Sequence, residues 1–223
     1  PSTLASLDIH SITPDTIPPM PEPTQKTSIA YIAGQFPLRS ETFVYREVRE
    51  LRRRGWKVVC VTLRAPTDPP PDAEDLIDGR LTVYDAWVRT AMTETGTHPV
   101  ASTKTMLRAE FDALSPGEPM STRQIAQLPA QAFAAQSLAR RLREHGVQHI
   151  HCHFAHAPTT VGMYAAHQLD IPFSFTGHAN DLFQRRVLLK KKLERAAFVS
   201  CISEEHRKLY NEIHARSDQD YPI

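Results

Sequence analysis

The second half of the chain alternates short apolar runs with helix-forming segments, and this alternation constrains the fold more than any other feature. Strands are expected at residues 147–154, 173–176 and 198–202, with helices at about 158–169, 182–195 and 204–214. Each helix would return the chain to the same end of the sheet, so neighbouring strands run parallel. The pattern predicts an α/β fold, a Rossmann-like doubly wound parallel sheet.

The first half supplies one more strand–helix–strand unit. Residues 28–33 and 57–63 are apolar enough for buried strands, and the helix between them, at 41–54, carries an apolar stripe that includes Phe43 and Val48. Ser40 is expected to cap this helix, because a serine hydroxyl accepts hydrogen bonds from first-turn amides.

Residues 64–120 give the weakest pattern in the chain. A mostly helical insertion is expected there, with a short strand at 81–84 and a helix at 101–114. A helix at 121–145 follows, and Pro129 is expected to divide or kink it. Residues 1–27 are rich in proline and are expected to form a flexible leader.

Composition and charge argue against a nucleic-acid partner and favour a cytoplasmic protein. The 26 basic and 25 acidic residues leave a net charge of +1, and no DNA-binding motif is present, so no nucleic-acid partner is expected. No apolar run has the length of a membrane-spanning helix, and no signal-peptide core is seen. Three scattered cysteines, Cys60, Cys152 and Cys201, indicate buried free thiols. A cytoplasmic protein is expected.

The stretch from Pro172 to Asp181 places polar chemistry directly after a strand. His178 and Asp181 follow the apolar run that ends at Gly177. The carboxyl ends of strands in an open α/β sheet are where ligands bind. An imidazole and a carboxylate there can donate, accept or carry a proton. Spacing alone also fits two residues that cap the next helix.

A second polar group lies on the strand at 147–154. His149, His151 and His153 share one face of that strand, while Cys152 points to the other. Three imidazoles on one face are able to ligate a metal, although no carboxylate or thiolate completes a recognisable pattern. Polar lining of a cleft and hydrogen-bonded packing are the alternatives.

Two further segments are ambiguous. The loop Gly34–Ser40 precedes a helix N-terminus, where backbone amides favour anions, yet it lacks the glycine pattern of a dinucleotide fold or a nucleoside triphosphatase. Residues 185–195 combine basic and apolar side chains. They fit either a solvated face or peripheral contact with an anionic membrane.

Several motifs resemble glycosyltransferase family 4, and most closely its branch that builds colanic acid and other exopolysaccharides. The resemblance lies in Phe36-Pro-Leu-Arg-Ser-Glu-Thr-Phe-Val44, in His151-Cys-His-Phe-Ala155, in Pro172-Phe-Ser-Phe-Thr-Gly-His-Ala-Asn-Asp181 and in Ala197-Phe-Val-Ser-Cys-Ile-Ser203. These segments occur in the family's order and span residues 28–213.

The resemblance implies the N-terminal, acceptor-side half of a GT-B fold, spanning residues 28–215. It implies a retaining hexosyltransferase that uses no metal or other cofactor and moves a sugar from a nucleotide-sugar donor to a glycan or lipid-linked acceptor. Residues 216–223 resemble the start of the linker to a donor domain. The chain to Ile223 would lack most donor contacts and would alone show little activity.

The resemblance also implies roles for particular residues. His178 would touch the transferred sugar, with Asp181 beside it, and the loop Gly34–Ser40 would approach the donor phosphates. Together with a cleft-lining role for the histidine strand, the expected substrate-binding residues are Gly34, Gln35, Phe36, Arg39, Ser40, Glu41, His153, Phe154, His156 and Thr176. A non-catalytic binding domain of the same fold and a metal hydrolase built on the histidine strand are the alternative functions.

Overall fold

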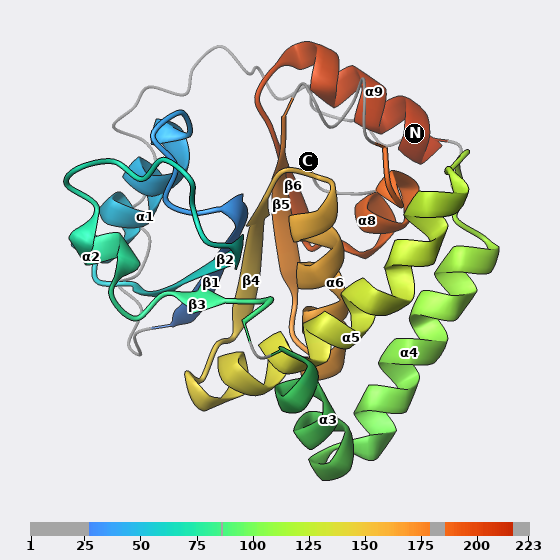
Figure 1. The fold of residues 1–223 in the computed structure, drawn as a ribbon. Coiled ribbons are helices and arrows are strands. Elements are labelled where there is room, and N and C mark those ends of the chain that lie inside the picture. The colour runs from blue at the N-terminus through green and yellow to red at the C-terminus, as the bar shows by residue number, and fades with distance from the viewer. Residues whose placement is uncertain (1–26, 86, 179–185, 216–223) are drawn as a thin grey trace, which may run out of the picture.

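Figure 1 shows the computed structural model, which describes residues 27–85, 87–178 and 186–215. The expected leader at 1–27, apart from Thr27, and the expected linker at 216–223 lie outside the described residues, as does Asp181.

The strands form one parallel sheet, which confirms the doubly wound α/β prediction. They are β1 (Ser28–Gln35), β2 (Lys57–Arg64), β3 (Leu81–Thr82), β4 (His149–His153), β5 (Phe173–Gly177) and β6 (Phe198–Cys201). Their order in the sheet is β3-β2-β1-β4-β5-β6, and every neighbouring pair is parallel. The order reverses between β1 and β4, which is where doubly wound sheets open a crevice for ligands.

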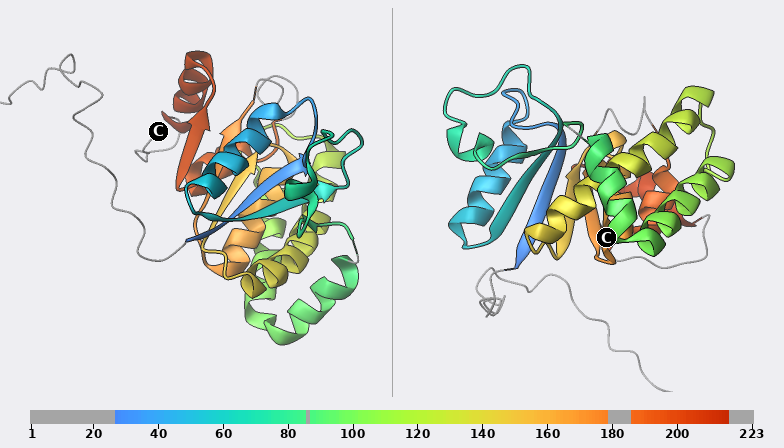
Figure 2. Two further views of the ribbon diagram at one scale, coloured as in Figure 1. Left: turned by 90° about the vertical axis from the view of Figure 1, so that its left-hand side faces the viewer. Right: turned by 60° about the horizontal axis from the view of Figure 1, so that its bottom comes forward.

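Helices cover both faces of this sheet. They are α1 (Thr42–Arg53), α2 (Glu74–Ile77), α3 (Trp87–Thr97), α4 (Pro99–Leu114), α5 (Thr122–Glu144), α6 (Ala157–Leu169), α8 (Leu189–Arg195) and α9 (Glu204–Ala215). Figure 2 shows α1 on one side of the sheet and α4, α5 and α6 on the other.

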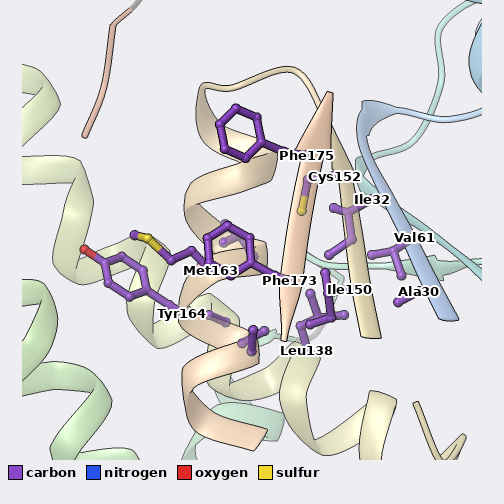
Figure 3. Packing of buried hydrophobic residues seen from close by; sticks show 14 of the residues in the cluster. Ala30, Ile32, Val61, Leu138, Ile150, Cys152, Met163, Tyr164, Phe173 and Phe175 are labelled. Atoms are coloured by element: carbon purple, nitrogen blue, oxygen red, sulfur yellow. The ribbon is translucent and has the colours of Figure 1, made fainter. Parts of the chain in front are cut away.

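Side chains alternate between two cores because successive residues of a strand point to opposite faces. From β1, Ile32 joins Ile150 and Cys152 of β4 in the larger core under α5 and α6 (Figure 3). Tyr31 points the other way, into a smaller core with Val48 of α1. Both faces of the central strands are therefore buried, as is usual in a parallel sheet, whereas β6 at the edge is only partly buried.

Several expected boundaries are wrong for identifiable reasons. Ser40 is not the cap of α1, because the helix begins at Thr42 with Glu41 in the cap position. Pro129 does not divide α5, which runs unbroken through it from a capping box formed by Ser121 and Gln124. Of the helix expected at 182–195, residues 182–185 lie outside the described residues, and α8 begins at Leu189, after Leu188 with its left-handed backbone angles.

The segment 64–120, for which a mostly helical insertion was expected, is built mainly of helices. It contains α2, α3 and α4, and the expected strand is reduced to the two residues of β3. α3 was not foreseen as a separate helix. Its Glu94 is fully buried, and its carboxylate lies 2.8 Å from the Arg143 guanidinium of α5.

The three cysteines are free thiols, as expected. Cys60 and Cys152 are buried, whereas Cys201, near the edge of the sheet on β6, is only half-buried. Within the described part of the chain, no helix combines the length and apolar character needed to cross a membrane.

Candidate functional site

A cleft of about 650 Å³ opens at the carboxyl ends of β1, β2 and β4, beside the reversal of strand order. Five residues expected to bind substrate line it: Gly34, Gln35, Glu41, Phe154 and His156. The chain thus brings its first βα loop and the loop after β4 to one cavity, although more than a hundred residues separate them.

The opposite wall of the cleft was not foreseen from the sequence. It comes from α5, through Gln127, Ala130 and Gln131, and from Arg64 at the end of β2. No local pattern marks these residues, because they reach the cleft only through the packing of α5 on the sheet. Glutamine on an exposed helix face carries no signal of its own.

Glu41 gives the cleft an acidic group with unusual properties. Its Oε2 atom is buried and has no hydrogen-bond partner among the described residues. Burial raises the pKa of Glu41 from 4.5 to about 7. Near neutral pH this carboxyl group is therefore present in both forms, and it can accept a hydrogen bond from a ligand or donate one to it.

Gln131 presents a second unsatisfied oxygen. Its Oε1 atom is also buried without a hydrogen-bond partner in the described part of the chain. A buried acceptor left unsatisfied costs free energy, so such atoms are expected to meet a donor when a ligand binds. Two acceptors in one cleft favour a ligand that carries several hydroxyl groups.

A buried lysine holds the loop after β4 in place. Lys192 of α8 is fully buried, and its Nζ atom donates to the carbonyl oxygens of Ala155 at 2.6 Å, His156 at 3.0 Å and Val187 at 2.6 Å. Phe154, at the start of this loop, has a positive φ of 72°. The ammonium group of Lys192 thus holds the rim of the cleft through these three hydrogen bonds.

This arrangement corrects the expectation that the basic residues of 185–195 share one solvated or membrane-facing surface. Lys192 points inward because the loop carbonyls need donors. Arg195 also points inward, and its guanidinium pairs with the fully buried Asp112 of α4. Lys190 and Lys191 of α8 are partly exposed, and the Lys190 ammonium lies 3.9 Å from the Glu194 carboxylate.

His178 lies in an aromatic cluster next to the cleft. Its ring centroid is 4.5 Å from that of Phe154, 4.8 Å from that of Phe43 and 5.8 Å from that of His153. Phe154 also lines the cleft, so His178 and the cleft are adjacent. Phe43 was assigned to the apolar stripe of α1, and its exposed ring is a contact that the sequence did not reveal.

The histidines of β4 are mostly engaged by hydroxyl groups of β5. The Ser174 hydroxyl lies 2.7 Å from His149 Nε2 and 2.8 Å from His151 Nδ1, and the Thr176 hydroxyl lies 3.1 Å from His151 Nε2. Burial lowers the pKa of His151 to about 3, so its ring is neutral. For His149 and His151 this is hydrogen-bonded packing. Thr176, expected to bind substrate, is buried and already engaged.

His153 has a different partner, Glu47 of α1. Their Nε2 and Oε2 atoms are 3.1 Å apart, and the Tyr31 hydroxyl donates to the other carboxylate oxygen at 3.1 Å. Burial acts to raise the pKa of Glu47, but the hydrogen bonds and charges of its neighbours outweigh it and lower the pKa. Glu47 is therefore an anion at neutral pH.

Glu47 also changes the group of residues that could hold a metal. Ligand atoms of Glu47, His151 and His153 lie within 4.8 Å of one another, whereas the sequence suggested His149 as the third member. An ion bound there would displace a hydroxyl partner of His151, since both its ring nitrogens are engaged. The arrangement fits a hydrogen-bonded support for the aromatic cluster at least as well.

Three residues expected to bind substrate lie elsewhere. Phe36 is buried in the smaller core, and its amide donates to the Thr62 hydroxyl, so its side chain does not reach a ligand. Arg39 and Ser40 are exposed and do not line the cleft. Arg39 pairs with Asp68 at 3.3 Å.

Replacing Glu41 with glutamine should change how stability depends on pH. The folded pKa of Glu41, about 7, lies above its ordinary value of 4.5, so the native protein is penalised as the carboxyl ionises. The penalty is absent below about pH 4.5 and complete above about pH 7. Urea unfolding should show Glu41→Gln gaining on the order of 1 kcal/mol over wild type between these limits, after allowance for solvent screening. Parallel pH profiles would contradict the assignment.

Replacing Lys192 with methionine should destabilise the protein by about 1–3 kcal/mol, because buried carbonyls of the cleft rim lose their donor while the side-chain length is kept. Lys191→Met is the matched control. It removes a neighbouring, partly exposed cation and should cost less than about 0.5 kcal/mol. Chemical denaturation measures both. Equal losses for the two variants would show that Lys192 has no special role.

Comparison with known proteins gives one result that bears on this site. No curated protein matches the sequence. The model of Glycosyltransferase Family 4 matches residues 40–218, which include α1, the loop after β4 and His178, whereas β1 and all of the first cleft loop except Ser40 precede the match. The match covers well over half of the chain, and it agrees with a parallel α/β sheet that has its cleft at the reversal of strand order. The chain belongs to glycosyltransferase family 4.

Proposed function

We propose that this chain is the N-terminal, acceptor-side half of a GT-B enzyme. The enzyme would be retaining and metal-independent, and would move a sugar from a nucleotide-sugar donor to a glycan or lipid-linked acceptor in exopolysaccharide synthesis. The observation that carries the proposal is the cleft itself. Two buried oxygens, from Glu41 and Gln131, await hydrogen-bond donors there, next to His178.

The acceptor would occupy the cleft between the first βα loop and α5. Sugar hydroxyl groups would donate hydrogen bonds to Glu41 and Gln131, which satisfies both buried oxygens. Phe154 and Tyr84, which also line the cleft, offer apolar ring surface to the carbon face of a sugar ring. A hydroxyl-rich acceptor thus matches both the polar and the apolar parts of the wall.

The donor sugar would lie beside His178, on the other side of Phe154. An imidazole hydrogen bond to a sugar hydroxyl orients the anomeric carbon, and retention requires the acceptor hydroxyl on the face that the leaving group departs from. Asp181 would stand near it.

The departing diphosphate gathers negative charge, which amides of the loop Gly34–Ser40 and the N-terminus of α1 would stabilise. The raised pKa of Glu41 limits its repulsion of that charge.

A transfer assay with the full-length protein encoded by the gene tests this function. With a panel of nucleotide sugars, His178→Ala should lower the rate at least about 100-fold, as loss of a transition-state hydrogen bond does. His149→Ala is the matched control. That histidine lies on the adjacent strand but bonds Ser174 away from the cleft, so activity should change little.

Three outcomes would contradict the proposal. Full activity in His178→Ala would remove the assigned role. Binding of nucleotide sugars or glycans without any turnover would favour a non-catalytic binding domain. Loss of transfer on treatment with a chelator, restored by added metal, would show that the reaction is not metal-independent.

A further inference from the structure

Helix α4 buries a largely polar side and exposes an apolar side, the opposite of what is usual for a helix on a protein surface. Its buried side is largely polar and includes Ser102, Thr105 and Asp112. Its outward side carries large apolar residues that are more than half exposed: Val100 at 68%, Leu107 at 58%, Phe111 at 54% and Leu114 at 86%. In Figure 1 this helix forms the right-hand margin of the molecule.

The exposed residues form one continuous stripe. Positions 100, 104, 107, 111 and 114 follow the alternating spacing of four and three residues that keeps side chains on one face of a helix. Lys104 is the only polar member. We call Val100, Lys104, Leu107, Phe111 and Leu114 the α4 stripe. At 1.5 Å per residue it is about 20 Å long, and contiguous apolar surface of this kind marks an interaction site.

Hydrogen bonds on the inner side fix this orientation of α4. The Thr105 hydroxyl donates to Gln168 Oε1 at 2.7 Å, and Gln168 Nε2 donates to the Ser102 hydroxyl at 3.1 Å. The Arg195 guanidinium and the Tyr164 hydroxyl both donate to Asp112. Turning the helix to bury the stripe would break these bonds, so the apolar face must point outward.

Cationic groups surround the stripe. Lys104 lies within it and Arg108 is exposed one turn further along α4. From α8, the ammonium of Lys191 lies 5.5 Å from the centre of the Phe111 ring, and Lys190 precedes it. The acidic groups nearby are largely engaged, since Glu118 accepts from the amides of Leu189 and Lys190, and Glu194 pairs with Lys190. Glu110 is the exposed acid of α4.

We propose that the α4 stripe docks on an anionic lipid surface. Leu107, Phe111 and Leu114 would enter the boundary between headgroups and acyl chains, while Lys104, Arg108 and Lys191 meet lipid phosphates. This places the membrane contact on α4, with Lys191 as its link to the segment 185–195. A second copy of the chain is a poorer occupant, because pairing stripe against stripe would bring together two surfaces that both carry Lys104, Arg108 and Lys191.

The stripe lies in a position that suits a lipid-linked acceptor, and this link between the stripe and the cleft rests on the proposed function. Lys191 contacts the stripe, and the next residue, Lys192, holds the rim of the cleft. A lipid-linked acceptor in the same membrane would therefore lie near the cleft. Membrane docking itself is independent of sugar transfer and is tested without it.

Sedimentation of the full-length protein with vesicles tests the proposal. Wild type should bind vesicles of phosphatidylcholine mixed with phosphatidylglycerol, and should bind phosphatidylcholine alone at least tenfold more weakly. Leu107→Ser/Phe111→Ser/Leu114→Ser should weaken binding at least about tenfold. Lys104→Gln should weaken it about fivefold, the effect of one cation near an anionic surface.

A matched control separates the stripe from exposed apolar residues in general. Val88→Ser/Met92→Ser removes two exposed side chains of α3 that lie outside the stripe, and it should leave vesicle binding unchanged. Circular dichroism and thermal unfolding should show the same fold in every variant, because the substituted residues are exposed.

Two results would overturn the proposal. The first is vesicle binding that the triple serine variant leaves intact. The second is a dimer, measured by light scattering, that the triple variant converts to a monomer, because the stripe would then be an interface between copies. Transfer to a water-soluble acceptor should survive the triple variant, and His178→Ala should keep vesicle binding, so failure of one proposal is distinguishable from failure of the other.

Discussion

The parallel pairing of β1 with β4 is the constraint on which the rest of the structure depends. It joins two halves of the chain that run outward in opposite directions from this pair. Both strands end at the same edge, so the loop from Gly34 and the loop from Phe154 meet there and leave a cleft between them. The two loops alone do not enclose the cleft. α5, packed on the sheet beside α6, completes the cavity with Gln131.

Buried polar groups decide how the elements around this pair are oriented. Lys192 sits inside because the loop after β4 exposes carbonyls inward, and His151 is held neutral between hydroxyl groups of β5. Asp112 draws Arg195 and Tyr164 to the inner side of α4, which leaves apolar residues on the outer side. The positions of the cleft rim and of the α4 stripe thus have the same cause: buried polar groups need hydrogen-bond partners, and these partners come from distant parts of the chain.

The sequence predicted the elements whose hydrophobic period matched their environment. All strands of the second half and the position of His178 after β5 could be predicted because short strand-like runs alternate with helix-forming segments there, although β4 carries three histidines and β6 is only partly buried. α4 could not be predicted as a core helix, since its buried side is polar and its exposed side apolar. Lys192 looked like part of a solvated face because nothing local marks a lysine whose partners are distant carbonyls. Gln131 and the Glu47–His153 pair were missed for the same reason. They are contacts between residues far apart in the chain.

The assignment of the cleft as the acceptor site and of His178 as the donor contact is best tested by a crystal structure of the full-length protein with a non-transferable nucleotide-sugar analogue and a glycan acceptor. We predict that the donor sugar contacts His178 and that acceptor hydroxyl groups lie within hydrogen-bond distance of Glu41 and Gln131. A glycan bound away from the cleft between the first βα loop and α5, with Glu41 and Gln131 still unpartnered, would contradict it.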